Sequence, residues 1–230
     1  MKSAPKPKNP KPKEVADERS ARVRILETAE RQFAELGFDG VSMRQVAVEA
    51  KVPVALVSYH FEGKLGLYRE VFRLRYPHIV EQRKAGLSLA QMEDDPERRL
   101  EMILKAVLVP MLKLRTVNGS FGILLAREAN DPNAAGRGII EEVFDPVARP
   151  AIELLRQTLA NKSEAEIVWS FQMVIGTMLY IMADTGRSRS LSGGACDPSD
   201  VDATLRLILP LLLNGLRGAN KTGSAKPTSS

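Results

Sequence analysis

Two short amphipathic segments, residues 42–50 and 53–59, follow each other in this chain with a link of only two residues between them. Ser42 and Gln45 have the spacing of a capping box, which predicts that a helix begins at Ser42. Pro53 suits the first position of a second helix, because its missing N–H would have no partner there. Two helices this short pack stably only if a longer helix completes their core.

The stretch before them predicts that longer helix. From about Arg19, apolar residues recur every three or four positions and place one apolar face on a helix, which Gly37 is suited to end. The residues of this face are Ile25 or Leu26, Ala29, Phe33 and Leu36. The three helices together predict a DNA-binding helix-turn-helix, in which the second short helix enters the major groove. Its exposed positions would be Val54, Ala55 and Ser58.

Lys64 lies at the predicted start of a further helix, just after Gly63 and the Tyr59-His60-Phe61 box. A lysine in the first helical turn opposes the helix dipole by roughly 0.3 to 1 kcal/mol. This placement favours a bound anion, because free N–H groups and an ammonium together form a phosphate site. Two alternatives stay open at this point: Lys64 as a solvated surface lysine, and His60 as a packing residue instead of a phosphate contact.

The run ILETAERQFAELGFDGVSMRQVAVEAKVPVALVSYHFEGKLGLYREVF resembles the N-terminal domain of the TetR family of transcriptional regulators over about fifty residues. The resemblance rests on the Ala-x-x-x-Phe spacing of the first helix, the Gly-Phe-x-Gly turn, the Ser-x-x-x-Val-Ala helix, and the Tyr-His-Phe box with its lysine. It implies a homodimeric regulator that binds a palindromic operator in double-stranded DNA. It also implies a helical C-terminal domain that binds a small ligand and forms the dimer.

The resemblance also implies roles for single residues. Ser42 and Arg44 would contact the DNA backbone or an adjacent base, Tyr59 and His60 would reach phosphates, and Lys64 would anchor the far strand.

Two positions depart from the family pattern. Pro53 stands where a serine or threonine often donates to a phosphate, and Ser58 stands where a second aromatic residue is common. Val54, Ala55 and Ser58 cannot make the bidentate base contacts of Arg, Asn or Gln. Base reading would therefore depend on thymine methyl groups, on Arg44 and on DNA shape.

Composition limits the other classes of function. The net charge is +5, but the first thirteen residues carry five lysines and no acid, which leaves about zero for the rest. We expect residues 1–13 to be a disordered Lys/Pro tail that is either a solvated tail or an additional nonspecific DNA contact. The neutral remainder supports the main alternative, a helical protein-interaction adapter that does not bind DNA.

Catalysis and metal binding have no support in the sequence. The chain has one cysteine and two histidines, and it lacks the GxGxxG, GxxxxGK and GxSxG motifs. We therefore expect a cytoplasmic protein that is not an enzyme and has no metal site and no cofactor.

The low aromatic content, with abundant Leu, Ala, Val, Met and Arg, favours an all-α fold. We expect a helix-turn-helix domain over residues 14–76, a larger helical ligand-binding and dimerisation domain over 77–217, and a disordered tail over 218–230. A helix over about 64–75 would join the domains and couple them. Pro110 should kink a helix around it, and Pro146 and Pro150 should bend or break the segment 133–160.

The last two predicted helices, about 164–182 and 199–216, are the most apolar part of the chain. Residues 167–183 carry no charge, at the lower edge of membrane-spanning length, but they include polar residues and no second such segment exists. We interpret the helix as buried in a bundle and expect no membrane segment. We predict that the last two helices pair across a two-fold axis in a homodimer.

Met and aromatic residues at helical spacing could line a pocket for a small hydrophobic effector, although ordinary core packing is an open alternative for each. The candidates are Met102, Leu108, Met111, Phe121, Leu125, Phe144, Trp169, Met173 and Tyr180. Arg127, Glu128 and Asn130 could supply polar groups, or Arg127 and Glu128 could form a surface ion pair. The segments IVWSFQMVIGTMLY and LRLILPLLLNGLRG are similar to a TetR subgroup that responds to fatty acyl compounds.

Overall fold

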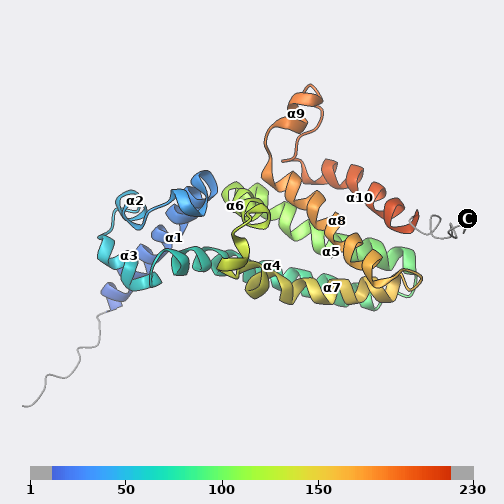
Figure 1. Ribbon diagram of the computed structural model, residues 1–230, viewed down its shortest axis with the longest axis horizontal. Coiled ribbons are helices and arrows are strands. Elements are labelled where there is room, and N and C mark those ends of the chain that lie inside the picture. Colours follow the sequence, from blue (N-terminus) through green and yellow to red (C-terminus); the bar gives the residue numbers. More distant parts are fainter. Residues whose placement is uncertain (1–11, 219–230) are drawn as a thin grey trace, which may run out of the picture. The chain divides into compact units, whose positions relative to one another are not determined.

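A computed structural model of the chain describes residues 12–218, and every regular element in that range is a helix (Figure 1). The predicted all-α fold class is confirmed. The chain divides into two compact units, the first ending at Val71 and the second beginning at Phe72. Both predicted tails lie outside the described residues, apart from Pro12, Lys13 and Gly218.

The first unit opens with α1, Pro12–Gly40. This helix begins earlier than the predicted start near Arg19, because proline is tolerated in the first turn of a helix, where its missing N–H has no partner to lose. Gly37 breaks the regular helix with φ 73° and ψ 175°, a left-handed conformation that glycine adopts without steric cost. The predicted end of the first helix at Gly37 is therefore confirmed.

The two short helices are α2, Met43–Glu49, and α3, Val54–Phe61. Ser42 caps α2 with both bonds of the predicted capping box: its Oγ accepts from the Gln45 N–H at 3.2 Å, and its own N–H donates to Gln45 Oε1 at 2.9 Å. Pro53 was predicted to be the first residue of α3, but it precedes the helix in an extended conformation as its N-cap. Its fixed φ of about −65° fits both positions, so the difference is one residue.

The long helix α4, Lys64–Gln91, starts in the first unit and continues in the second. It runs well past the predicted end near Arg75, through Pro77. Proline in a helix removes one hydrogen bond. Tyr76 and Ile79 on either side of it are buried, and this packing offsets the loss.

The core of the first unit is a cluster of aromatic and aliphatic side chains. The Tyr68 ring of α4 packs edge-on against Phe33 and Phe38, with centroids 4.7 and 5.0 Å apart. Val57 and Phe61 of α3 are buried in the same unit. These contacts provide the cover that the two short helices need.

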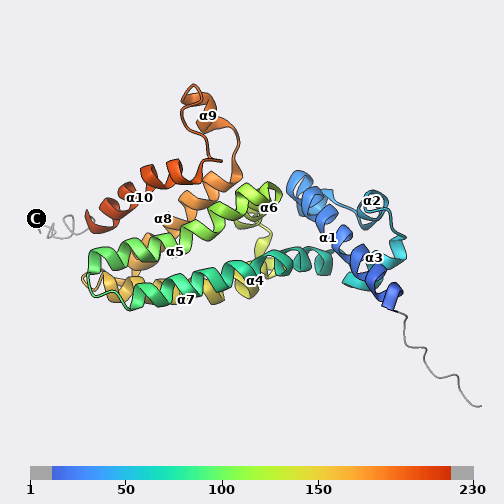
Figure 2. The same cartoon turned by 180° about the vertical axis from the view of Figure 1, so that it is seen from behind.

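The second unit is a helical bundle in which α6 lies beside α8 and α5 packs against both (Figures 1 and 2). α7 and α10 also pack against α5. After α4, the elements are α5 Pro96–Val117, α6 Gly119–Asn130, η1 Ala134–Arg137, η2 Ile140–Phe144, α7 Asp145–Thr158, α8 Glu164–Ala183, α9 Arg187–Leu191 and α10 Val201–Gly218.

The predicted long segment 133–160 is broken, as its prolines indicate. A 3₁₀ turn, η1, and a π-helical turn, η2, precede α7, and Pro146 lies in the first turn of α7. Pro150 lies inside α7 without ending it. Phe144 at the end of η2 and Asp145 at the start of α7 line a cavity described below.

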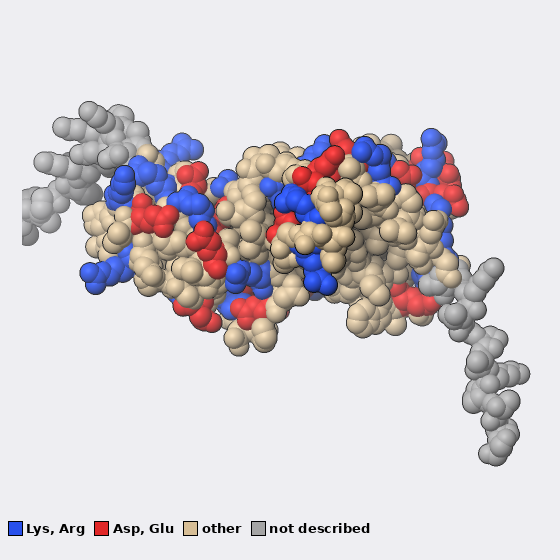
Figure 3. Space-filling model, turned by 90° about the horizontal axis from the view of Figure 1, so that it is seen from above, with Lys and Arg blue, Asp and Glu red and all other residues tan. Residues whose placement is uncertain are grey.

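One side of α8 and α10 remains apolar and exposed. Trp169 and Met173 on α8 are 68% and 65% exposed, and Leu207 and Leu211 on α10 are 64% and 72% exposed. The face that carries α9 and α10 shows mostly uncharged side chains over α10 (Figure 3). Within the described range, α8 alone is long and apolar enough to cross a membrane by composition, and one-third of its most apolar window is buried.

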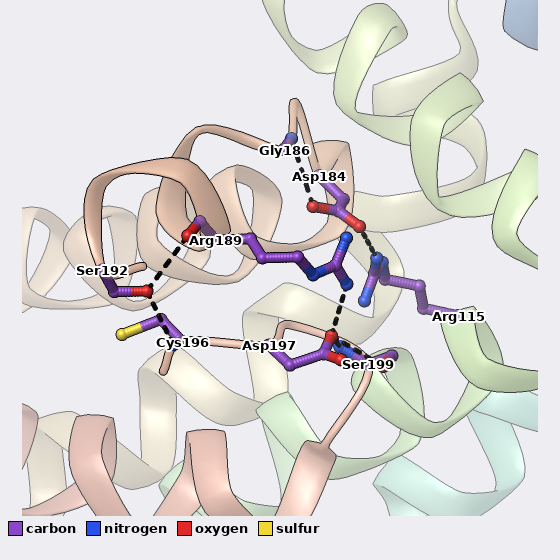
Figure 4. Close-up of polar contacts among 8 residues, drawn as sticks. All are labelled: Arg115, Asp184, Gly186, Arg189, Ser192, Cys196, Asp197 and Ser199. Carbon is purple, nitrogen blue, oxygen red and sulfur yellow. Dashed lines mark hydrogen bonds and ion pairs between the residues drawn. The ribbon is translucent and has the colours of Figure 1, made fainter. Parts of the chain in front are cut away.

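The connection between α8 and α10 projects from the bundle and is ordered by charged side chains (Figures 1 and 4). Arg189 of α9 pairs with Asp197 at 2.7 Å, and the side-chain and backbone groups of Ser199 donate to the same carboxylate. Hydrogen bonds from Ser199 and Arg189 lower the pKa of Asp197 to about 2. Asp184 at the end of α8 pairs with Arg115 of α5.

Gly66 is required where α3 meets the start of α4. A Cβ atom at this position would lie 1.9 Å from the carbonyl oxygen of Phe61, too close for any side chain. We therefore expect Gly66→Ala to lower the free energy of unfolding by about 1 to 3 kcal/mol, measured by urea denaturation followed by circular dichroism. Gly119→Ala, where the new Cβ meets open space, is the control and should change little. Equal losses in both variants would reject the close-approach explanation.

Candidate DNA-binding surface and ligand cavity

The third helix has two distinct faces. Val57 and Phe61 point into the core of the first unit and are buried, with exposures of 0% and 2%. Ala55 and Tyr59 lie on the opposite face and Ser58 lies at its flank, because a helix turns 100° per residue. These residues are exposed, and so is Val54 in the first turn of α3, so the predicted base-reading residues Val54, Ala55 and Ser58 are all accessible. The structure thus presents a short, free helical face at the positions that the sequence indicates.

Ser42 and Arg44 at the start of α2, and Pro53 at the start of α3, are exposed as well. The oxygen of Ser42 is already engaged in the helix cap. Arg44 has no such structural contact among the described residues and is the one long cationic side chain on this helix. It has the reach for a base edge or a phosphate.

The three residues of the Tyr59-His60-Phe61 box differ in how far their side chains are exposed to solvent. Tyr59 is 76% exposed, His60 is half-buried, and Phe61 is in the core. The His60 ring lies edge-on to both neighbours, with centroids 5.5 Å from Tyr59 and 5.9 Å from Phe61. The His60 ring therefore packs against both neighbours, and Tyr59 is the more exposed of the two polar residues.

Lys64 is the first residue of α4, as predicted, and its side chain folds back onto the end of α1. Its Nζ donates to the carbonyl oxygen of Asp39 at 3.2 Å and lies 4.6 Å from the centre of the Phe38 ring. Neither alternative for Lys64 included this contact. The ammonium has two further protons, so the structural contact leaves it able to meet a phosphate.

Glu49 fixes the end of α2 against α1. Its carboxylate accepts from Gln32 at 2.6 Å and from Arg31 at 2.9 Å, and these two hydrogen bonds lower the pKa of Glu49. The bonds join α1 to the end of α2.

The second unit encloses a cavity of about 280 Å³. Most of its lining is apolar and comes from α5, α6, α7, α8 and η2. Three polar side chains, Arg83, Asp145 and Gln172, also reach it. Its apolar lining includes Met111, Leu125, Phe144, Phe171, Ile175 and Met178.

The predicted ligand residues fall into three groups. Met111, Leu125 and Phe144 line the cavity. Leu108 and Phe121 are fully buried core residues that do not line it, and the Phe121 ring packs against Phe72 at 5.5 Å. Outside the cavity lie Met102, in a separate groove against α4, and Trp169, Met173 and Tyr180, on the exposed side of α8.

The three predicted polar ligand residues on α6 lie in two different places. Arg127 and Asn130 are exposed and line a surface depression together with Tyr180. Glu128 is fully buried, and Arg137 of η1 pairs with it at 2.8 Å and with Asp131 at 2.6 Å. Arg127 was a candidate surface partner for Glu128, but Glu128 is fully buried and pairs with Arg137.

Arg83 is a cavity residue that the sequence analysis missed. It lies on α4 in step with the buried residues Tyr76, Ile79, Leu87 and Ala90, so it occupies a position on the apolar face of that helix. A charged residue at a core position is the signal that could have identified it. Among residues 12–218, no group of three or more His, Cys, Asp or Glu side chains could hold a metal ion.

Two sequence-family profiles match the chain. Residues 25–71 match "Bacterial regulatory proteins, tetR family", and residues 98–215 match "Tetracyclin repressor-like, C-terminal domain". The first match covers the three-helix unit, and the second covers most of the bundle with the cavity.

Similar proteins include the probable acrEF/envCD operon repressor of Escherichia coli K12, which is 27% identical over 206 residues, covering 85% of this chain and 90% of the relative. The fold is similar to that of the fatty acid degradation regulator FadR from Bacillus halodurans, with a TM-score of 0.62, 19% identity and coverage of 91% and 99% of the two chains. FadR from Bacillus subtilis, solved in complex with stearoyl-CoA, has a TM-score of 0.58, 16% identity and coverage of 84% and 98%.

The buried pair of Glu128 and Arg137 predicts a large effect on stability. Arg137→Met leaves Glu128 buried without its main partner, so we expect the free energy of unfolding to fall by about 3 to 5 kcal/mol in urea denaturation. Arg156→Met is the matched control, since Arg156 pairs with Glu153 and Glu164 at the surface and should contribute about 1 kcal/mol or less. Comparable losses in the two variants would contradict the buried-pair argument.

Proposed function

Because the chain belongs to the TetR family of bacterial regulatory proteins and is a DNA-binding transcriptional regulator, we propose that it is a homodimeric repressor released from its operator by a small hydrophobic effector. Regulators of this family are not enzymes. The alternative of an adapter without DNA binding is excluded by the family assignment. We place the protein in the cytoplasm, where its operator is accessible.

The observation that carries the DNA-binding proposal is the free face of α3. Helix α3 buries Val57 and Phe61 and exposes Val54, Ala55, Ser58 and Tyr59. This is the arrangement that lets a recognition helix enter the major groove while its inner face stays in the core. We propose that Tyr59 and Lys64 contact phosphates, with a weaker contribution from His60, and that Ser42 and Pro53 lie against the DNA backbone.

This surface has few side chains that could distinguish one DNA base from another. Val54 and Ala55 can contact thymine methyl groups, and Ser58 can accept or donate one hydrogen bond. Arg44 is the side chain best able to form a bidentate contact with guanine. The remaining preference would come from the shape and deformability of the operator.

We propose that the dimer forms through α8 and α10. Their exposed apolar side chains repeat at helical spacing, which places Trp169, Met173 and Tyr180 on one stripe of α8, and Leu207 and Leu211 on one stripe of α10. Two helices from each of two copies would bury these stripes as a four-helix interface. Such a dimer holds two recognition helices about 34 Å apart, one turn of DNA.

The effector proposal rests on the apolar cavity of the second unit. Its volume of about 280 Å³ is near the lower end of pockets that take small organic ligands. Met111, Leu125 and Phe144 would contact the ligand. An effector that binds more tightly to a conformation unable to hold DNA shifts the population away from the operator. Helix α4 contributes residues to both units and would transmit this change.

Phosphate contacts predict a specific pattern in gel-shift titrations on the promoter beside the protein's own gene. Lys64→Ala should weaken binding to all sequences and reduce the slope of log affinity against log salt by about 1, because one fewer counterion is released. Tyr59→Phe removes only the hydroxyl and should weaken binding about tenfold with the salt slope unchanged.

Lys113→Ala, in the exposed surface of the second unit, is the charge-matched control and should leave both quantities unchanged. Circular dichroism separates loss of contact from loss of fold, since Lys64 also packs on Phe38. Wild-type affinity in both Tyr59→Phe and Lys64→Ala would reject these phosphate contacts.

A charge placed in the apolar stripe of α10 should break the dimer. Leu211→Glu is expected to sediment as a monomer at micromolar concentration, because pairing would bury two carboxylates without partners. The wild-type protein should sediment as a dimer. Leu89→Glu is the control, since Leu89 on α4 is similarly exposed at 60% but lies outside the stripes. A monomeric wild-type protein, or a dimeric Leu211→Glu variant, would rule out this interface.

A further inference from the structure

Arg83 is a buried cation without a carboxylate partner. It is 5% exposed, and among the described residues no Asp or Glu forms an ion pair with it. Its Nη2 donates to the carbonyl oxygen of Val107 at 3.0 Å and contacts the Met178 sulfur at 3.8 Å, and its Nε has no hydrogen-bond partner within the described chain. Burial lowers the pKa of Arg83. A buried charge in this state is costly unless something else compensates it.

The contrast with the other buried arginine of this unit is informative. Arg137 is equally buried, but two carboxylates, Glu128 and Asp131, neutralise it. The bundle can therefore supply counter-charges where a structural role requires them. At Arg83 it supplies a carbonyl, a thioether and the neighbouring Tyr76 hydroxyl, none of which carries a net charge.

Arg83 also borders open space. It lines the 280 Å³ cavity, so its guanidinium faces room for another molecule. Tyr76, two turns earlier on the same face of α4, has a buried hydroxyl beside Arg83, and burial raises its pKa to about 12. The Tyr76 ring packs on the cavity residue Phe144, with centroids 4.7 Å apart. A neutral hydroxyl donor thus lies close to the cation.

The charges around the cavity limit what the ligand can carry. Arg83 is the one cationic side chain among the described residues that line it, and Asp145 contributes a carboxylate to the same lining. Asp145 is half-exposed and lies 3.9 Å from the exposed Arg149, and its charge also acts on Tyr76 at the cavity. A group with a single negative charge balances Arg83, whereas a doubly charged phosphate would exceed the available positive charge.

We propose that this cavity takes an apolar molecule with one carboxylate, and that Arg83 binds the carboxylate. The planar guanidinium fits a carboxylate through two parallel N–H donors, and the rest of the lining matches a hydrocarbon body. The inference rests on the proposed effector function and adds the charge class of the effector to it. Arg83 is the residue that distinguishes an acid from a neutral lipid of the same length.

Three probes with the same eight-carbon body test the charge: octanoate, 1-octanol and octyl phosphate, titrated into the full chain by isothermal calorimetry at pH 7. We expect octanoate to bind at least about tenfold more tightly than 1-octanol, because hydrogen bonds to charged groups are the strong ones. Arg83→Met should remove this preference by weakening octanoate and leaving 1-octanol unchanged. Arg83→Lys keeps the charge but loses the planar pair of donors, and should give an intermediate affinity.

Arg98→Met is the matched control, since it makes the same substitution at an exposed position of α5 outside the cavity. It should bind all three probes as the wild type does. Arg83→Met is expected to fold, with an equal or higher Tm, because an apolar side chain replaces an uncompensated buried charge. In the wild-type protein octanoate should raise the Tm more than 1-octanol does, a comparison that needs no variant.

Four results would overturn the inference. The first two are equal affinity of the wild type for octanoate and 1-octanol, and a preference for octanoate that persists in Arg83→Met. The other two are tightest binding of octyl phosphate, and no binding of any probe at millimolar concentration. The effector function is judged separately, by release of operator DNA with fractions of a cell extract. An extract fraction that releases the operator, while octanoate shows no preference, keeps the effector function and rejects the carboxylate.

Discussion

A helix of seven or eight residues has little stability of its own in water, because its nucleation costs more than its few hydrogen bonds return. α2 and α3 have these lengths, so both depend on burial against α1 and α4. Each fully buried aliphatic or aromatic side chain contributes about 1.5 to 3 kcal/mol, more than the roughly 1 kcal/mol of the Ser42 cap. The burial of Val57 and Phe61 therefore also decides which side chains α3 exposes.

The two buried arginines of the second unit have different surroundings. Arg137 joins Glu128 and Asp131 and ties η1 to the end of α6, a closed arrangement that serves the fold. Arg83 borders a cavity, donates to the neutral carbonyl of Val107 and has no carboxylate in an ion pair with it among the described residues. The neighbouring positions of the same face of α4 are filled by apolar residues such as Ile79 and Leu87. This difference in partners is the reason to assign Arg137 to the fold and to propose Arg83 as a ligand contact.

Local signals predicted the first unit well. The capping box at Ser42, the break at Gly37 and the start of α4 at Lys64 depend on neighbouring residues, and the structure has all three. The end of α4 could not be predicted in this way. Pro77 is a local stop signal, but the burial of Tyr76 and Ile79 offsets one lost hydrogen bond, and that burial depends on residues far away in the chain.

The cavity was predictable only in part for a related reason. Periodicity identifies the apolar side of a helix but cannot tell a side that faces a cavity from one that faces a partner. Met111 and Trp169 looked alike in sequence, yet one lines the cavity and the other is exposed. Arg83 was missed because an arginine is usually read as a surface residue, and only the positions of its helical neighbours reveal that it lies inside.

The exposed stripe of α8 holds the only tryptophan of the chain, Trp169. Indole emission depends on contact with water, so a partner that covers this stripe changes the intrinsic fluorescence of the protein without any label. The first unit and the lining of the cavity contain no tryptophan and contribute nothing to that signal. The protein therefore carries its own spectroscopic probe of subunit association, placed where binding in the cavity or at α3 does not touch it directly.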